Sequence, residues 1–203
     1  MALKDKKHGL IVVSAPSGAG KSTLCVRLLK EYSDRLALSI STTSRSPRGV
    51  EQHGIEYFFT GKEDFAEKIA RDAFAEWAQV HDNYYGTSKQ TLEDFWNAGK
   101  HVLLDIDVQG AESLRQAYPE RCLTVFIAPP SIEVLEQRLR GRGTDSEETI
   151  QKRMKNAVGE LKEQSKFDLI IVNNALEDAY QQLNKAVTGF MNSLEGGTWQ
   201  KHP

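Results

Sequence analysis

A glycine-rich segment near the start of the sequence has the residue types that bind a polyphosphate. Residues 15–22 read Ala-Pro-Ser-Gly-Ala-Gly-Lys-Ser; they follow an apolar run at residues 10–13 and precede a segment of helical period. Backbone N–H groups in such a loop, at the N-terminus of a helix, offer many donors without side-chain bulk. The segment therefore predicts a site for a nucleoside triphosphate, in which Lys21 contacts the β- and γ-phosphates and Ser22 binds Mg²⁺.

Ala15 stands where the strict form of this motif has its first glycine, but its side chain is small enough for the loop to form. The motif indicates nucleotide binding without indicating what is done with the nucleotide. The residues expected at the triphosphate are Ala15, Pro16, Ser17, Gly18, Ala19, Gly20, Lys21, Ser22 and Thr23.

A second apolar run, at residues 102–108, carries two carboxylates near its end. Because side chains alternate along a strand, Asp105 and Asp107 are expected on the same face, directed into the cleft. In proteins with such a phosphate loop, an acid at this strand end neighbours the metal and the phosphates. Asp105 is therefore a candidate ligand of Mg²⁺ through water. The alternative is an ordinary solvated strand end.

Two arginines lie three residues apart in the segment Ser-Thr-Thr-Ser-Arg-Ser-Pro-Arg at residues 41–48. The planar fork of arginine matches phosphate oxygens better than the point charge of lysine does. Arg45 and Arg48 therefore predict a second phosphate site, of the kind that a phosphoryl acceptor needs beside a bound triphosphate. Taken alone, two loop arginines more often belong to a solvated surface.

The elements that must position these residues follow from the apolar pattern. Runs that are apolar throughout suit strands buried on both faces, and their alternation with segments of helical period indicates a parallel sheet covered by helices. We therefore predict an α/β fold with one domain, residues 1–203. The expected strands are residues 10–13, 102–108, 123–128 and 169–172.

The pattern changes between about residues 36 and 80, where short strand-like pieces alternate with Pro47, Gly49 and Gly54. We interpret this region as an insertion beside the main sheet. Helix starts are expected at Ser131 and within residues 144–148, because both places offer N-cap oxygens.

The composition excludes several classes of function. The 26 basic and 28 acidic residues give a net charge of -2, so we expect no basic surface for nucleic acid or an anionic membrane. Cys25 and Cys122 lie in apolar segments without the spacing of metal ligands and are expected to be reduced and buried. The apolar stretch after the charged N-terminus is too short for a signal peptide or a membrane span, which predicts a cytoplasmic protein.

Several separate segments of the sequence form a recognisable set. They are STTSRSPR at residues 41–48, residues 54–57, FAEWA at 74–78, NYYGT at 83–87, DIDVQG at 105–110 and GRGT at 141–144. Together they resemble the guanylate kinase family, and they occur in the family's order along the chain. The resemblance covers about residues 9–190 and therefore rests on more than one motif.

This resemblance implies a P-loop kinase that moves the γ-phosphoryl group of ATP onto GMP, with Mg²⁺ as cofactor and dGMP as an open alternative acceptor. It also implies two appended parts on the parallel sheet. They are a GMP-binding insertion at about residues 36–90 and a lid at about residues 138–155. Apart from the resemblance, the two glycines at residues 196 and 197 indicate a terminal tail at residues 195–203.

By the same resemblance, Glu76 would read guanine together with the hydroxyl groups of Ser41 and Thr87. Guanine presents N1–H and N2–H₂ donors beside its O6 acceptor, so a carboxylate accepts from the first two. Adenine reverses this pattern and would leave the carboxylate unpaired. The implied GMP-binding residues are Ser41, Arg45, Arg48, Tyr57, Glu76, Tyr85, Gly86, Thr87, Asp105 and Asp107.

The lid would bring Arg142 and Arg153 onto the transferring phosphoryl group, where they stabilise its charge and exclude water. Arg140 is interpreted instead as a solvent-facing residue. The implied catalytic residues are Lys21, Arg45, Arg48, Arg142 and Arg153.

Two further residues are implied on the ATP side. Arg138 is expected to be another lid contact, and Asn173 matches a position near the adenine of ATP. A helix N-cap is an equally good interpretation of Asn173 or of Asn174.

Two other functions stay open on the sequence. A guanylate-kinase-like interaction domain would keep the fold and bind a protein segment, but such modules are expected to lose the phosphate loop that residues 15–22 retain. A P-loop kinase for AMP or a pyrimidine nucleotide is expected to differ around Glu76 and Tyr85. The oligomeric state is not indicated.

Overall fold

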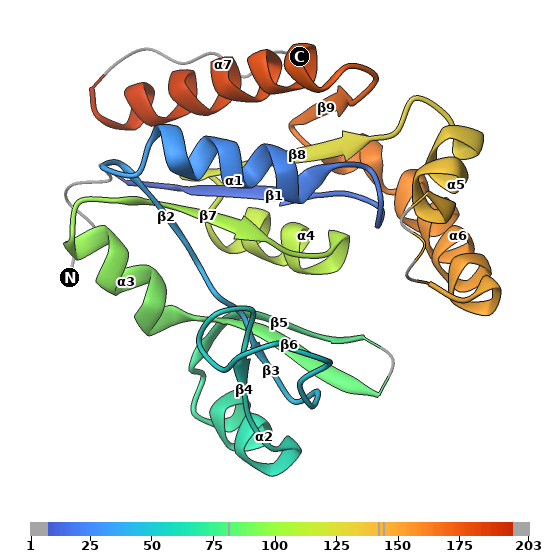
Figure 1. The fold of residues 1–203 in the computed structure, drawn as a ribbon. Coiled ribbons are helices and arrows are strands. Elements are labelled where there is room, and N and C mark those ends of the chain that lie inside the picture. Colours follow the sequence, from blue (N-terminus) through green and yellow to red (C-terminus); the bar gives the residue numbers. More distant parts are fainter. Residues whose placement is uncertain (1–7, 81, 142, 144, 197–203) are drawn as a thin grey trace.

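The structure, a computed structural model, describes residues 8–80, 82–141, 143 and 145–196. Its central layer is a five-stranded sheet in which all neighbouring strands run parallel (Figure 1). Every residue of the two strands at its centre is buried, which explains why their sequences are apolar almost throughout. From edge to edge the strands are β2 (Leu36–Leu38), β7 (His101–Asp105), β1 (Leu10–Ser14), β8 (Cys122–Ala128) and β9 (Leu169–Val172).

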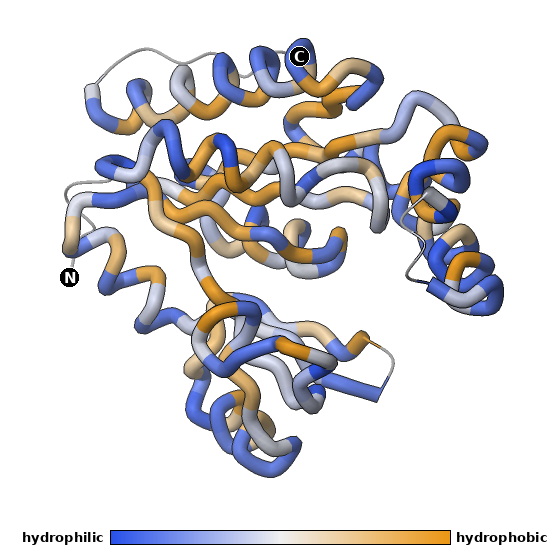
Figure 2. Tube along the Cα trace, viewed as in Figure 1, coloured by the Kyte–Doolittle hydropathy of each residue, from blue (hydrophilic) through white to orange (hydrophobic). Residues whose placement is uncertain are grey.

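Helices cover both faces of this sheet, which confirms the predicted α/β class. One face carries α1 (Lys21–Glu31) and α7 (Leu176–Leu194), and the other carries α3 (Lys89–Asn97) and α4 (Val108–Ala117) (Figure 1). Apolar residues follow the strands and the inward sides of these helices, whereas polar residues face outward (Figure 2). None of the helices in the described ranges combines the length and the apolar character needed to cross a bilayer.

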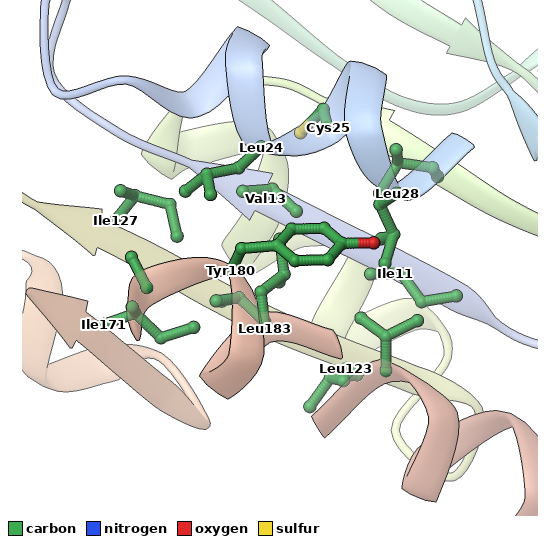
Figure 3. Packing of buried hydrophobic residues seen from close by; sticks show 14 of the residues in the cluster. Ile11, Val13, Leu24, Cys25, Leu28, Leu123, Ile127, Ile171, Tyr180 and Leu183 are labelled. Carbon is green, nitrogen blue, oxygen red and sulfur yellow. The ribbon is translucent and has the colours of Figure 1, made fainter. Parts of the chain in front are cut away.

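Tyr180 of α7 lies at the centre of the core beneath α1. Its ring is 1% exposed and packs among apolar side chains that include Leu24 and Leu183 (Figure 3). Its hydroxyl group donates to Glu31, and the guanidinium carbon of Arg27 lies 3.7 Å from the ring centroid. A buried aromatic ring with a paired hydroxyl group contributes both apolar area and directional contacts. These contacts hold α1, the helix that follows the phosphate loop, against α7.

Both cysteines are buried, as predicted. Burial raises the pKa of Cys25 to about 12, so its thiol stays protonated at neutral pH and packs as an apolar group.

A second sheet of four strands lies beside the main one (Figure 1). α2 (Lys62–Ala70) covers one face of it through Phe65, whose ring stacks on Phe74 at a centroid distance of 4.5 Å. Residues 36–38 belong to the main sheet, so the insertion begins later than the boundary predicted from the sequence. That three-residue edge strand was too short to stand out as an apolar run. The second sheet contains, in spatial order, β4 (Phe58–Phe59), β3 (Thr42–Thr43), β6 (Asn83–Ser88) and β5 (Phe74–Val80).

A helical hairpin is attached to the main sheet beyond β8 (Figure 1). It consists of α5 (Ile132–Arg140) and α6 (Glu147–Lys162). Ser131 and Ser146 cap the two helices, as the sequence predicted. The hairpin has a small core of its own, formed by Leu135, Leu139, Ile150 and Ala157.

Arg140 joins the two helices of this hairpin at their surface. Its guanidinium group donates to Glu136 at 2.8 Å and to Glu147 at 2.7 Å. The side chain is 42% exposed, which agrees with the solvent-facing position that we expected. A short 3-10 turn, η1 (Gln164–Lys166), leads from α6 back to the sheet.

His101, whose side chain is fully buried, connects the start of β7 to the end of α7. The His101 Nδ1 atom accepts the Gly9 N–H group at 3.1 Å, and its Nε2 atom lies 3.1 Å from a carboxylate oxygen of Glu195. Glu195 also pairs with Arg35 at 2.9 Å. Glu195 therefore belongs to the folded body, although it was assigned to the tail at residues 195–203. Residues 197–203 lie outside the described residues.

We expect protonation of His101 to destabilise the fold, so that the free energy of unfolding falls as the pH drops below about 6.5. Burial lowers the pKa of His101 in the folded protein, so the unfolded chain takes up the proton more readily and acid favours unfolding. Urea denaturation of the wild type and of His101→Asn at about pH 8 and about pH 5.5 measures this effect. The loss of stability should be larger in the wild type, with the exposed His53→Asn as control. Equal losses in the wild type and His101→Asn would contradict the assignment.

Candidate active site

The phosphate loop, residues 15–20, joins the end of β1 to the start of α1, whose first backbone N–H groups have no partner within the helix and can bind an anion. Gly20 is the N-cap of α1 and has a φ of 95°, a left-handed conformation that other residues rarely adopt. A Cβ atom at this position would lie 2.3 Å from the side-chain nitrogen of Asn173. Backbone conformation and packing therefore both require glycine here.

A cleft of about 410 Å³ opens in front of this loop. Apart from Ala19, which is buried behind it, all residues predicted at the triphosphate line the cleft. The end of β7, the start of α4 and one residue of α6 form its other walls. The lining residues are Ser14, Ala15, Pro16, Ser17, Gly18, Gly20, Lys21, Ser22, Thr23, Asp105, Ile106, Asp107, Val108 and Glu160.

Lys21 and Asp105 form an ion pair within the cleft. The register of the parallel strands explains it, because Asp105 lies opposite Val13, just before the phosphate loop begins. The side chains of Lys21 and Asp105 are 19% and 35% exposed, so the pair is only partly shielded from solvent. The structure thus brings together the two groups that the sequence placed beside the phosphates and the metal.

Asp107 lines the cleft from the start of α4 and not from a strand, as was predicted. β7 ends at Asp105, and Asp107 is the N-cap of α4, where its carboxylate accepts the N–H groups of Gln109 at 2.8 Å and Gly110 at 3.0 Å. The prediction that strand alternation places both acids on one face is therefore wrong. The apolar run continues into the first residue of α4, which made the strand look longer than it is.

Glu160 of α6 lines the same cleft, and no motif pointed to it. Burial raises the pKa of Glu160 to about 7; Lys21 acts in the opposite direction and Asp107 in the same one. In the sequence it is one more acid on a charged helix. The only signal was its spacing, because a residue seven positions after Arg153 lies on the same side of α6.

Asn173 and Arg138 support the loop from behind. The Asn173 side chain donates to the carbonyl group of Ala19 at 2.7 Å, and Arg138 donates to the carbonyl group of Asn173 at 2.9 Å. α7 begins after Ala175, which makes no side-chain capping bond. The interpretation of Asn173 or Asn174 as a helix N-cap is therefore wrong.

The residues predicted at the second phosphate lie around the second sheet. Arg45 is 8% exposed, and its guanidinium group bonds both carboxylate oxygens of Glu51 at 3.0 Å. The rings of Tyr57 and Tyr85 lie 5.9 Å apart, and Arg45 lies 5.4 Å from the Tyr57 centroid. Arg48 is exposed nearby, and its backbone N–H group donates to Glu51. The sequence analysis missed Glu51, because an acid in an irregular loop carries no motif.

Glu76 of β5 is 7% exposed and accepts a hydrogen bond of 2.6 Å from the hydroxyl group of Thr87 in β6. Burial raises the pKa of Glu76 to about 7, although the bond from Thr87 lowers it. Gly110 leaves room for this carboxylate, because a Cβ atom there would lie 2.9 Å from it. Ser41 immediately precedes β3, and Gly86 is buried within β6.

The second sheet and the phosphate loop both border the region at the end of β7. Burial, Tyr85 and then Asp105 raise the pKa of Tyr57. The charge of Asp107 likewise adds to the rise in the pKa of Glu76. Such electrostatic effects act between groups that lie close to one another. The two sets of predicted residues therefore face a common region.

Of the two arginines predicted to contact the transferring phosphoryl group, Arg153 lies within the described residues, whereas Arg142 lies outside them. The Arg153 guanidinium donates to the Ser17 hydroxyl at 3.0 Å and pairs with Asp145 at 3.1 Å. α6 therefore contacts the phosphate loop directly through the side chain that the sequence assigned to the transferring group.

The donors in the cleft fit Mg²⁺. The hydroxyl group of Ser22 and the carboxylate of Asp105 line the same space. Magnesium prefers such oxygen ligands and is usually held by one or two of them together with water and phosphate oxygens.

A lysine-bearing phosphate loop at the end of the central strand of a parallel sheet defines a P-loop protein of the α/β class. The model of the guanylate kinase family matches residues 7–189. The chain therefore belongs to the guanylate kinase family.

Individual proteins give the same result. The chain is 51% identical over 174 residues to the guanylate kinase of Fusobacterium nucleatum, which covers 86% of this chain and 92% of the relative. It is 46% identical over 200 residues to that of Anaeromyxobacter dehalogenans, with 98% and 88% covered. The crystal structure of guanylate kinase from Anaplasma phagocytophilum is similar with a TM-score of 0.72 and 29% identity, covering 94% of this chain and 88% of that one.

We expect Asn173→Ala to weaken the phosphate loop, whereas Asn174→Ala should have little effect. Asn173 is 5% exposed and its amide satisfies the Ala19 carbonyl group, so its removal should cost about 1–3 kcal/mol of stability. Asn174 is exposed and serves as the matched control. Thermal unfolding and ATP titration of both variants measure the effect. Equal behaviour of the two variants would show that the loop does not depend on Asn173.

Proposed function

We propose that the protein is a guanylate kinase that transfers the γ-phosphoryl group of ATP to GMP, giving ADP and GDP. The observation that carries the proposal is the buried Glu76–Thr87 pair on the second sheet, next to the cleft of the phosphate loop. A triphosphate site and a site able to read a base thus adjoin one another. Family membership and the relatives described above support the same reaction. They give no support to an interaction domain or to a kinase for another nucleotide.

On the ATP side, we infer that Lys21 exchanges Asp105 for oxygens of the β- and γ-phosphates. Asp105 would then be free to help hold the metal, and the Ser22 hydroxyl group would be a second oxygen ligand. Mg²⁺, when bound, offsets part of the charge on the phosphate oxygens. The N–H groups of the loop and the helix N-terminus fix the triphosphate in place.

On the acceptor side, Arg45, Arg48, Tyr57 and Tyr85 would hold the phosphate of GMP. Glu51 restrains the guanidinium group of Arg45 through two contacts of 3.0 Å. A restrained side chain loses little entropy when the phosphate binds. The acceptor phosphate would then lie in line with the γ-phosphate, which is the main requirement for this transfer.

Guanine recognition would fall to Glu76, with Thr87 and Ser41 beside it. The ionised carboxylate accepts from the N1–H and N2–H₂ donors of guanine, and Thr87 already orients it. Adenine offers an unprotonated N1 at that edge and would leave a buried carboxylate without a partner. dGMP carries the same base and phosphate and would meet the same groups.

The hairpin of α5 and α6 would act as the lid. Arg153 contacts Ser17 of the phosphate loop, and Arg138 supports the loop through Asn173. We infer that Arg142 also contacts the phosphates when both substrates are bound. Closure would place positive charge next to the phosphoryl group during its transfer and exclude water that would otherwise hydrolyse ATP.

We also propose a cytoplasmic location, as expected from the sequence.

Replacement of Lys21 by methionine tests the reaction. Lys21→Met should lower the turnover of GMP about 10²- to 10³-fold, because it removes a preorganised cation from the developing charge. Lys30→Met, at the exposed end of the same helix, is the control. A coupled assay of ADP formation with GMP, dGMP, AMP, CMP and UMP gives both the turnover and the acceptor. Preference for an acceptor without guanine, or full turnover by folded Lys21→Met, would contradict the proposal.

The affinity for GMP should rise with pH through the range in which Glu76 ionises. Burial raises the pKa of Glu76 to about 7, so at lower pH the carboxyl group is protonated and presents a donor to the donors of guanine. Well below that pKa, affinity should fall about tenfold per pH unit. GMP titrations of the wild type and Glu76→Gln between about pH 5 and about pH 8 measure it. Protonation of GMP itself changes its affinity for both proteins in the same way. A ratio of wild-type to Glu76→Gln affinity that stayed constant across this pH range would therefore contradict the role assigned to Glu76.

A further inference from the structure

Asp145 lies in the turn between α5 and α6, next to Arg153. Its side chain is 12% exposed, and one carboxylate oxygen lies 3.1 Å from Nη2 of Arg153. The other oxygen is buried and finds no hydrogen-bond partner among the residues that the structure describes. A buried carboxylate that is only half satisfied is unfavourable for stability. Its presence therefore suggests a role other than holding the turn.

Arg153 is held from two directions. Nη2 pairs with Asp145, and Nη1 donates to the hydroxyl group of Ser17 at 3.0 Å. Ser17 belongs to the phosphate loop and lines the cleft. A guanidinium group has five N–H donors, so these two contacts leave donors for a phosphate oxygen beside Ser17.

We propose that Asp145 is a positioning residue for phosphoryl transfer, which fixes the guanidinium group of Arg153 at the phosphate loop. The inference rests on the proposed function, because it takes the transferring group to pass beside Ser17. Asp145 and Arg153 both belong to the α5–α6 hairpin, so the pair stays together when the hairpin moves as a unit. Asp145 thus orders Arg153 before the phosphates arrive, and less side-chain freedom is lost in the transition state.

A residue that only stabilised the hairpin would behave differently. The Arg140–Glu147 pair joins the same two helices at 2.7 Å but lies on the exposed surface, and neither residue contacts the phosphate loop in the structure described. Loss of Glu147 therefore weakens the hairpin without disturbing Arg153. Glu147→Gln is the matched control for Asp145→Asn, since each change replaces a hairpin carboxylate by its amide.

The experiment compares the wild type, Asp145→Asn, Glu147→Gln, Arg153→Ala and the double variant Asp145→Asn/Arg153→Ala. We expect Asp145→Asn to lower kcat about tenfold, which corresponds to the ordering of one long side chain. The KM for GMP should stay unchanged, because Arg153 acts on the donor side. Glu147→Gln should keep the kcat of the wild type. In the Arg153→Ala background, Asp145→Asn should cause no further loss, because it acts through the arginine.

Two results would overturn the inference. One is a kcat of Asp145→Asn that matches Glu147→Gln, and the other is a full additional loss in the double variant. Side-chain NMR of the arginine Nε–H groups is a readout that does not depend on the reaction. The Arg153 signal, assigned by its loss in Arg153→Ala, should be sharp in the wild type and broadened in Asp145→Asn. If the wild type failed to phosphorylate GMP, the proposed function would fall, and an unchanged Arg153 signal would still refute the positioning role.

Discussion

The ion pair between Lys21 and Asp105 is the interaction on which the arrangement of the site depends. A site for a polyphosphate needs a cation, but a partly buried ammonium group without a partner loses hydration, and no other interaction compensates that cost. Asp105 compensates that charge, and it can do so only because β7 lies directly beside β1 in the sheet. In the proposed reaction, binding of ATP would exchange one anion for another around Lys21. The released carboxylate would then lie where the metal ion and its water molecules are needed. The order of the central strands is therefore as much a requirement of the chemistry as of the fold.

The cleft and the adjoining face of the second sheet contain several acids, which is unexpected for a site that we assign to two anions. Two features reduce their effective charge. Asp107 accepts two N–H groups at the positive end of α4, where the helix dipole favours a carboxylate. Burial raises the pKa values of Glu76 and Glu160 to about 7, so each is partly protonated near neutral pH. These acids thus carry less negative charge than their number suggests, and their charge can respond to a bound cation or to guanine.

The sequence predicted the parts of the site that are local and missed those that depend on tertiary contacts. The phosphate loop was recognisable because strand, glycines, lysine and helix are contiguous. Asp105 lies 84 positions from Lys21, and it was expected near the phosphates only because the class of loop implies such an acid. Its ion pair with Lys21 was not predicted. Asp107 was placed on a strand because its helix begins with an apolar residue, so the hydrophobic pattern does not mark the boundary. Glu51 and Glu160 went unnoticed, and Asp145 was interpreted only as part of a helix start, since an isolated acid in a loop or on a charged helix has no signature until its partner is known. β2 was missed in the main sheet because three residues are too few for a period to be read.

The distribution of apolar contacts separates the rigid part of the molecule from the parts that must adapt. The phosphate loop is anchored to the large core between the sheet, α1 and α7, and a hydrogen bond from the Asn173 side chain to the Ala19 carbonyl group stabilises it further. The hairpin, in contrast, has its own small core, so the proposed lid movement would leave the main core closed. The second sheet likewise has its own aromatic packing, in which Phe65 lies between Phe74 and Tyr84. Transfer between two bound phosphates requires water to be excluded only when both substrates are present. A fixed loop flanked by two separately packed parts meets that requirement, because each part can approach the cleft while the core keeps Lys21 in place.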